Sequence, residues 1–359
     1  MEYPKKLIDM IMEYADAFGP SGFEDDVLLV ARKYLDGLGE IKEDHMRNLY
    51  LYRKENTGDK PVLMLDAHSD EVGFMVHSVK PNGTLRFVKL GSTADNALSS
   101  ADVLVRNTRG EYIPGVIAAK PPHFASQAER NQTPSYKEMV IDIGAASYDE
   151  AVNDFAIGIG EPVVPATKCR FDEKHGLFFG RAFDCRIGCA VMTEALRRLE
   201  GETLGVDVVA VLSSQEELGE RGCKLAANRV KPDIAYAFEG CPADDTFTEP
   251  YAIQTAMRKG PMFRHMDVSV ICTPRYQRFV LDLAKEKNIK AQASVREGGG
   301  NDGAVLINVA PGAPVVVAGV PVRYIHSSNC ITAYEDFESS VQLTVEVLKA
   351  LNADVVAGF

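Results

Sequence analysis

The stretch Pro61-Val62-Leu63-Met64-Leu65 is a continuous apolar run, and Asp66-Ala67-His68-Ser69-Asp70-Glu71 follows it directly. A run of this length suits a β-strand, and the lack of polar alternation indicates that both faces of the strand are covered. Strands of this kind are typical of α/β proteins. The polar residues that follow mark the end of the strand.

Similar apolar runs recur further along the chain and alternate with helical patterns. Residues 206–212, 234–238 and 314–318 are predicted strands, and residues 190–199 are a predicted helix. A last helix is predicted to start near Asp336. This alternation implies an α/β fold with a mostly parallel sheet and helices on both faces.

The first residues of the chain also predict two helices. The first carries an apolar stripe that includes Leu7, Ile11 and Tyr14, and Gly19-Pro20 ends it. Ser21-Gly22-Phe23-Glu24 then has the pattern of a capping box, so we expect the second helix to begin there.

A segment from about Gly73 to Val164 differs from the rest of the chain. Helical stripes are absent there, and short β-rich runs are separated by turns such as Pro81-Asn82-Gly83, a strong hairpin signal. We interpret residues 73–164 as a small inserted β domain. Residues 1–72 and 165–359 then form one α/β domain.

Composition narrows the range of functions. The chain has 359 residues, of which 46% are hydrophobic and 25% charged, and its net charge is -12. This acidic balance argues against nucleic-acid binding, and no apolar run is long enough for a membrane span. The N-terminus lacks a signal peptide's apolar core, so we expect a cytoplasmic protein. The seven cysteines are scattered without a Cys-x-x-Cys pair, which predicts buried thiols and no cysteine zinc site.

Polar residues that follow the predicted strands are the candidates for chemistry, because ligands of α/β sheets collect at the carboxyl ends of the strands. Imidazoles and carboxylates there would suffice for two divalent metal ions if one carboxylate bridges, with one carboxylate left as a general base. Structural alternatives remain open at this point: the histidines as hydrogen-bonding groups, Glu216-Glu217 as a solvated pair, and Asp184 and Glu239 as caps.

Several motifs resemble those of the TET-type dinuclear metallo-aminopeptidases, also called glutamyl or deblocking aminopeptidases, whose relatives are sometimes labelled endoglucanases. The resemblance runs nearly from end to end and implies a zinc-exopeptidase-like fold. The motifs are Gly19-Pro20-Ser21-Gly22-Phe23-Glu24, Ala67-His68-Ser69-Asp70-Glu71-Val72-Gly73, Ile141-Asp142-Ile143-Gly144-Ala145, Ala182-Phe183-Asp184-Cys185-Arg186-Ile187-Gly188, Gln215-Glu216-Glu217-Leu218-Gly219-Glu220-Arg221-Gly222 and Arg323-Tyr324-Ile325-His326-Ser327.

The resemblance also implies a role for each site residue. Asp184 would bridge two metal ions, and the remaining ligands would be His68, Glu217, Glu239 and His326. Glu216 would be the general base, and Asp70 would orient the imidazole of His68. We also expect Glu216 and Glu217 to point to opposite faces of an extended backbone.

Three features depart from the family pattern. Relatives usually place an Asp where this chain has Glu239, so the site must adjust to a longer side chain. They commonly read Asp-Asn-Arg where this chain has Asp184-Cys185-Arg186, and we interpret Cys185 as a neutral replacement. Gly299-Gly300-Asn301-Asp302-Gly303 replaces a Gly-Gly-Thr-Asp-Ala loop that is expected to border the substrate pocket.

The implied function is an aminopeptidase that removes N-terminal residues from short peptides with metal-activated water. Its cofactors would be two divalent ions per subunit, zinc or cobalt. The alternative enzyme is a related amidohydrolase, a carboxypeptidase or deacylase on the same scaffold, which Glu239 keeps open. A glycosidase would need no metal, and the intact ligand set argues against a pseudo-enzyme that serves only in assembly.

Self-assembly is the remaining expectation. In this family the inserted domain supports a hollow tetrahedron of twelve subunits that admits only peptides. We therefore expect a homo-oligomer, without a choice between dimer and dodecamer. His123 matches a position where the insertion reaches toward a neighbouring active site, although a loop histidine in a proline turn is an equal alternative.

Overall fold

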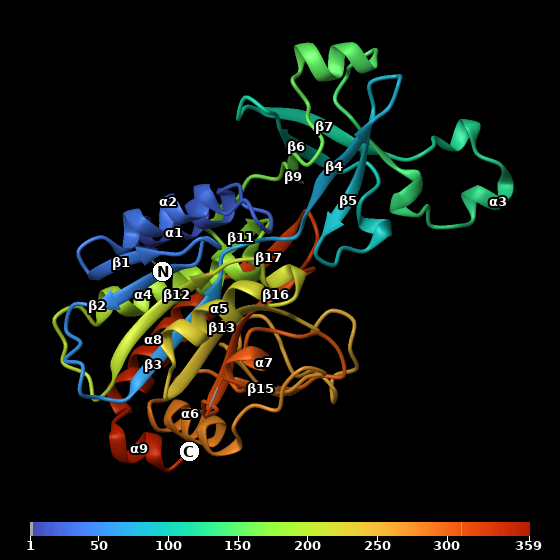
Figure 1. The fold of residues 1–359 in the computed structure, drawn as a ribbon. Coiled ribbons are helices and arrows are strands. Elements are labelled where there is room, and N and C mark those ends of the chain that lie inside the picture. Colours follow the sequence, from blue (N-terminus) through green and yellow to red (C-terminus); the bar gives the residue numbers. More distant parts are fainter. Residues whose placement is uncertain (1–2, 310) are drawn as a thin grey trace.

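The apolar run that begins at Val62 forms strand β3 (Val62–His68), which lies in the middle of a large sheet (Figure 1). The computed structural model describes residues 3–309 and 311–359. β3 pairs in parallel with β12 (Asp207–Ser213) on one side and with β13 (Ile234–Pro242) on the other. β13 pairs in parallel with β16 (Val315–Arg323). The predicted apolar strands therefore form the parallel centre of the sheet, which confirms the fold class.

Additional strands, most of them antiparallel to their neighbours, extend this parallel centre. Over the described ranges 3–309 and 311–359 the sheet has 11 strands in the order β1-β2-β12-β3-β13-β16-β17-β11-β10, with β14 and β15 joined beside β16. The added strands are β1 (Gly39–Glu43), β2 (Leu49–Arg53), β10 (Arg170–Asp172), β11 (Leu177–Gly180), β14 (Met262–Met266), β15 (Gln292–Val295) and β17 (Cys330–Ala333).

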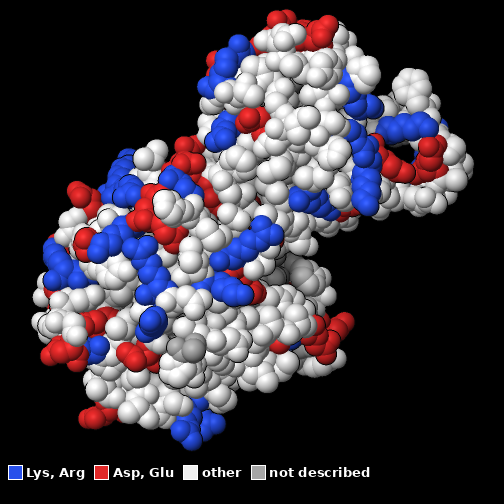
Figure 2. All heavy atoms as spheres, viewed as in Figure 1, with Lys and Arg blue, Asp and Glu red and all other residues white. Residues whose placement is uncertain are grey.

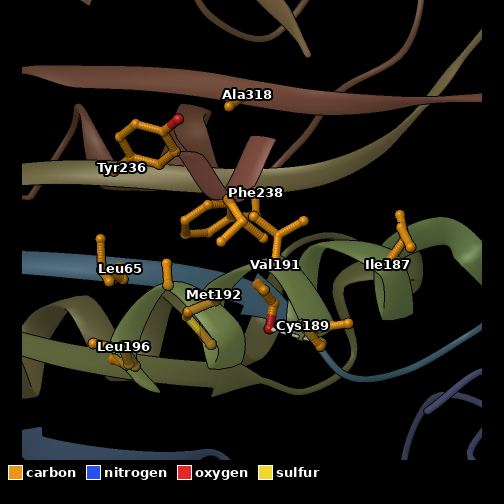
Figure 3. Close-up of a cluster of buried hydrophobic side chains, with 14 of the residues drawn as sticks. Leu65, Ile187, Cys189, Val191, Met192, Leu196, Tyr236, Phe238 and Ala318 are labelled. Carbon is orange, nitrogen blue, oxygen red and sulfur yellow. Dashed lines mark hydrogen bonds between the residues drawn. The ribbon is translucent and has the colours of Figure 1, made fainter. Parts of the chain in front are cut away.

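Helices cover both faces of the sheet because alternate residues of each strand point to opposite sides. Leu63 and Leu65 of β3 belong to the larger core, whereas Met64 belongs to the core on the other face. Figure 3 shows Val191 and Met192 packed near Leu65 and Phe238 in the larger core. The larger core lies under α1 (Lys5–Asp16), α2 (Asp25–Leu35), α4 (Phe183–Arg198), α6 (Pro274–Glu286) and α8 (Tyr334–Ala350). The smaller core lies under α5 (Arg221–Val230) and α7 (Gly303–Leu306), and α9 (Ala353–Ala357) ends the chain.

Among the described residues, no helix is long and apolar enough to cross a membrane.

A closed β-barrel projects from this α/β body (Figures 1 and 2). It has a hydrophobic core of its own, which includes Phe74, Val105 and Ile141. As predicted, Asn82 and Gly83 lie in a hairpin turn, where Gly83 has a φ of 84°. The barrel strands are, in spatial order, β4 (Gly73–Val79), β5 (Leu85–Leu90), β8 (Val140–Asp142), β7 (Tyr112–Ala118), β6 (Asp102–Arg106) and β9 (Pro162–Pro165).

An arm of residues 119–139 leaves the barrel between β7 and β8 and extends away from the body (Figure 1). It carries the short turns η2 (Pro122–Phe124) and η3 (Tyr136–Glu138) and the helix α3 (Gln127–Arg130). Phe124 in this arm is 76% exposed. The remaining short helical segments of the barrel are η1 (Asp95–Ala97) and η4 (Glu150–Asp154).

Candidate metal centre

The site residues predicted from the sequence converge at the carboxyl ends of the parallel strands. His68 is the last residue of β3, and it pairs in register with Ser213, the last residue of β12. The loop after β12 therefore starts beside His68, and it carries the turn η5 (Glu216–Leu218). Glu239 lies on β13, and His326 follows β16. This arrangement agrees with the general rule that ligands of α/β sheets gather at this edge.

Asp184, near the start of α4, lies between the two histidines. Its Oδ1 is 3.3 Å from Nε2 of His68, and its Oδ2 is 2.9 Å from Nε2 of His326. Oε1 of Glu217 is 3.2 Å from Nε2 of His326. Oε2 of Glu239 is 3.6 Å from Nε2 of His68. The side chains thus form two groups, one around each imidazole, and both groups include Asp184.

Asp70 connects His68 to the turn that carries the two glutamates. Its Oδ1 lies 3.4 Å from Nδ1 of His68 and accepts a hydrogen bond of 2.9 Å from the backbone N of Glu216. Its Oδ2 accepts hydrogen bonds from the backbone N of Glu217 (3.2 Å) and from Oγ of Ser21 (2.5 Å). The backbone O of Asp70 is the hydrogen-bond partner of Nδ1 of His68, at 3.2 Å, so the fully buried Asp70 contacts both the imidazole and the turn.

The predicted capping box at Ser21 is wrong. Helix α2 begins at Asp25, and its N-cap, Glu24, makes no capping bond through its side chain. The Ser21 hydroxyl donates to Asp70 instead, and Oε1 of Glu24 accepts from the backbone N of Gly22 and of Gln215. Tertiary contacts at the site have therefore taken the side chains that the local pattern assigned to a helix end.

The predicted extended backbone at Glu216 and Glu217 is also wrong. Both residues lie in the 3₁₀ turn η5, which follows Gln215 with a positive φ of 54°. Atoms of both carboxylates lie within 4.8 Å of one another and of a ring nitrogen of His68, but each carboxylate also has a contact of its own. Oε2 of Glu216 is 3.9 Å from Nε2 of His68, whereas Glu217 faces His326.

The electrostatics of the cluster show an excess of buried negative charge. Burial, together with the charges of Asp184 and Asp302, raises the pKa of the Glu239 carboxyl to about 8, although His68 opposes this. Burial also raises the pKa of Glu216 well above its usual range. Burial would lower the pKa of His326, but its contacts with Asp184 and Glu217 outweigh this and raise the pKa to about 11. The carboxylates of the cluster therefore favour the binding of a proton or a cation.

The donor atoms fit divalent metal ions. His68, Asp184, Cys185 and Glu239 each offer one atom, and these atoms lie within 4.8 Å of one another; Asp184, Glu217 and His326 do the same in a second group. Within the described residues, Oε1 of Glu239 is buried without a hydrogen-bond partner. Such nitrogen and oxygen donors are those that zinc and related ions take in catalytic sites.

A cavity of about 610 Å³ opens onto this cluster and exposes Asp184, Glu216, Glu217, Glu239 and His326. Gly299 and Gly300 line it, in agreement with the prediction that the glycine-rich loop borders the pocket. Arg264 and Arg296 also line it. His68 and Asp70 lie behind this surface, since both are almost fully buried.

Sequence reasoning missed several residues near the site. Arg264 reaches the cavity from β14, a strand that no pattern predicted. Asp66 and Asp302 are both buried and share the hydroxyl of Ser213, which lies 3.2 Å from Oδ2 of Asp66 and 3.1 Å from Oδ2 of Asp302. The only available signal was that Asp66 interrupts an apolar strand.

A sequence model described as M42 glutamyl aminopeptidase matches residues 48–343. The chain belongs to this family. This chain is thus a hydrolase and an exopeptidase, which confirms the resemblance and the predicted enzyme class.

Individual members of the family match this chain over nearly its whole length. The glutamyl aminopeptidase of Lactococcus lactis is 30% identical over 355 residues, which are 98% of each chain. The structure of a TET aminopeptidase from a marine sediment archaeon of the Thaumarchaeota has a TM-score of 0.94 and 34% identity, and the match covers 98% of this chain and 99% of that one. The TET1 peptidase of Pyrococcus horikoshii, which can assemble into a tetrahedron or a large octahedral shell, has a TM-score of 0.86 and 27% identity, with 96% and 100% coverage.

Proposed function

We propose that this protein removes N-terminal residues from short peptides and that it uses two divalent metal ions per subunit, zinc or cobalt, to do so. One observation carries this proposal: the two oxygens of Asp184 face two different histidines, at 3.3 and 2.9 Å. A carboxylate placed in this way suits a bridge between two cations. His68 and Glu239 would complete one position, and Glu217 and His326 the other.

Two divalent ions bound there would polarise the scissile carbonyl and make a water molecule more acidic. Glu216 would take the proton from this water and deliver it to the leaving amine. Its carboxylate lines the cavity, and the bond from its backbone N to Asp70 fixes the turn that carries it. Proximity of cations favours the ionised carboxylate that a general base requires.

A pair of chromogenic substrates tests this function against the alternative amidohydrolase. One substrate has a free N-terminal amine, and the other is the same compound with the amine acylated. We expect hydrolysis of the free amine substrate alone, in the presence of zinc or cobalt. Preferential hydrolysis of the acylated compound would support a deacylase instead.

We also propose that residues 73–164 form a separate domain that drives self-assembly into a closed homo-oligomer. The arm and the barrel expose large apolar side chains, including Phe124 and Ile159, which are 76% and 78% exposed. Exposed apolar groups on a projecting lobe are typical of protein interfaces. Light scattering on the purified protein tests this proposal, and a monomer at micromolar concentration would contradict it.

A further inference from the structure

Two of the departures from the family pattern meet at one place in the structure. Cys185 and Glu239 belong to the same group of candidate ligand atoms as His68 and Asp184. Cys185 is completely buried, and its Sγ donates a hydrogen bond of 3.1 Å to the carbonyl O of Phe238, the residue before Glu239. The thiol is therefore fixed at the edge of the proposed metal position rather than free in the core.

Gly188 on α4 provides the room for this placement. A Cβ atom at Gly188 would lie 2.4 Å from the Sγ of Cys185 and 3.0 Å from the Cβ of Phe238. Any larger residue would thus push the thiol or the strand β13 away. The close approach of α4 and β13 keeps the sulfur beside the carboxylate of Glu239.

Glu239 supplies a second, independent sign that a ligand is bound here. Its side chain is 7% exposed, and its Oε1 has no hydrogen-bond partner within the described residues. A buried carboxylate oxygen without a partner is costly unless a cation or proton is present. The second group, formed by Asp184, Glu217 and His326, includes no sulfur atom.

We propose that the Sγ of Cys185 is a ligand of the metal ion held by His68, Asp184 and Glu239. This inference rests on the dinuclear centre of the proposed function and makes its two positions chemically different. One position offers nitrogen, oxygen and sulfur, and the other offers nitrogen and oxygen only. Because thiolate is a soft ligand, the first position would favour zinc or cadmium over manganese.

Coordination exchanges one bond for another. The S–H bond and its hydrogen bond to Phe238 would break, the proton would leave by way of the cavity lined by Asp184 and Glu239, and the sulfur electron pair would bind the cation. A divalent ion ionises a coordinating thiol outright. In the metal-free protein the Sγ of Cys185 keeps its hydrogen bond to the carbonyl O of Phe238.

The absorption spectrum of the full-length protein loaded with Co²⁺ tests the proposal. A sulfur ligand gives an intense sulfur-to-cobalt charge-transfer band in the near ultraviolet, which nitrogen and oxygen ligands do not give. We expect this band in the unmodified protein and its loss in Cys185→Asn. The matched control is Cys189→Ser, which should keep the band. Cys189 lies in the core shown in Figure 3, where its Sγ donates to the carbonyl O of His68 and belongs to neither ligand group.

The spectrum of the unmodified protein tests the sulfur ligand even if a variant fails to fold. If the Co²⁺-loaded protein lacks the band, the proposal is overturned. A competition between cadmium and manganese gives a second readout. Cys185→Asn should lose cadmium affinity at one position by at least about tenfold while manganese binding changes less. Equal losses for both ions would contradict a sulfur ligand.

Peptidase assays in parallel separate this proposal from the proposed function. The band together with no hydrolysis of a free-amine substrate would support the sulfur ligand and overturn the aminopeptidase function. Hydrolysis without the band would support the aminopeptidase function and overturn the sulfur ligand.

Discussion

Glu216 and Glu217 are adjacent in the chain, yet they face different histidines across the site. Oε2 of Glu216 lies 3.9 Å from Nε2 of His68, and Oε1 of Glu217 lies 3.2 Å from Nε2 of His326. Both backbone N atoms donate to the carboxylate of Asp70, so the turn η5 has a fixed orientation. This geometry suits a division of labour in which one carboxylate binds metal and the other moves protons.

Substitution of each glutamate by glutamine should separate these roles. Glu216→Gln keeps the size of the side chain and removes its basicity, so we expect both metal ions to remain and kcat to fall by about 10²–10⁴-fold. Glu217→Gln should instead weaken metal binding, with activity partly restored by excess metal. Elemental analysis and steady-state kinetics on both variants measure the two effects.

Glu297→Gln is the matched control, because Glu297 lines the same cavity but belongs to neither ligand group. Its kcat should stay within the same order of magnitude as that of the unmodified protein. Near-normal turnover of Glu216→Gln with full metal content would show that the base has been assigned to the wrong residue.

Metal stoichiometry gives a second prediction. The metal-loaded protein should hold two divalent ions per subunit, and a chelator should abolish peptidase activity until metal is restored. His326→Gln removes one ligand of the second group, so it should lower the count to about one ion. His175→Gln should keep two ions, since His175 is exposed and pairs with Asp172 away from the site. A count that never exceeds one in the unmodified protein would exclude the dinuclear centre. Glu239, which stands where relatives usually have Asp, would then be the first residue to test as the cause.

Apolar runs were enough to predict the parallel centre of the sheet. The run that begins at Val62 and the strands near Val208, Ala235 and Val315 are buried on both faces, so continuous apolar sequence identifies them. The strand-end rule then placed His68 and the glutamates at one edge. The hairpin at Asn82-Gly83 was predictable because its turn depends on local backbone conformation alone.

Contacts between distant elements were beyond such patterns. The hydroxyl of Ser21 fits a helix cap by local sequence, but it bonds to Asp70, which is 49 residues away. The approach of Cys185 to Glu239 depends on how closely α4 packs on β13 at Gly188. Periodicity reports which face of an element is buried, not which element covers it, so these site contacts could not be read from the sequence.

Removal of the barrel tests the proposed assembly role. The chain enters and leaves the barrel side by side, since Phe74 of β4 pairs with Val163 of β9. The barrel core is also separate from the two cores of the body. Replacement of residues 73–164 by a short Gly-Ser linker should therefore leave a folded body that no longer forms the large assembly. Light scattering on both proteins measures this, and a deletion protein of unchanged subunit number would place the interface on the body.

Arg186 provides the last prediction, on stability. Its guanidinium is buried and donates to the carbonyl O atoms of Tyr14 (2.8 Å), Ala17 (3.0 Å) and Gly19 (3.0 Å), where α1 ends. It also lies 3.4 Å from Oε1 of the buried Glu71. Arg186→Met would leave these carbonyls without a donor, whereas Glu71 would keep its ion pair with the buried Arg181. We therefore expect a loss of about 3 kcal/mol in the free energy of unfolding, mainly from the unpaired carbonyls.

A second arginine on the same helix is the control for this substitution. Arg198 forms a partly exposed ion pair with Glu338 at 2.7 Å, and its side chain is 30% exposed. Arg198→Met should cost about 1 kcal/mol or less, because solvent screens such pairs and stabilises each charge when the other is removed. Both variants should be unfolded in urea with a chelator present, so that metal binding does not enter the comparison. If Arg186→Met shifts the unfolding midpoint no more than Arg198→Met does, the bonds to the end of α1 contribute little, and the positions of α1 and α4 are set by the apolar core between them.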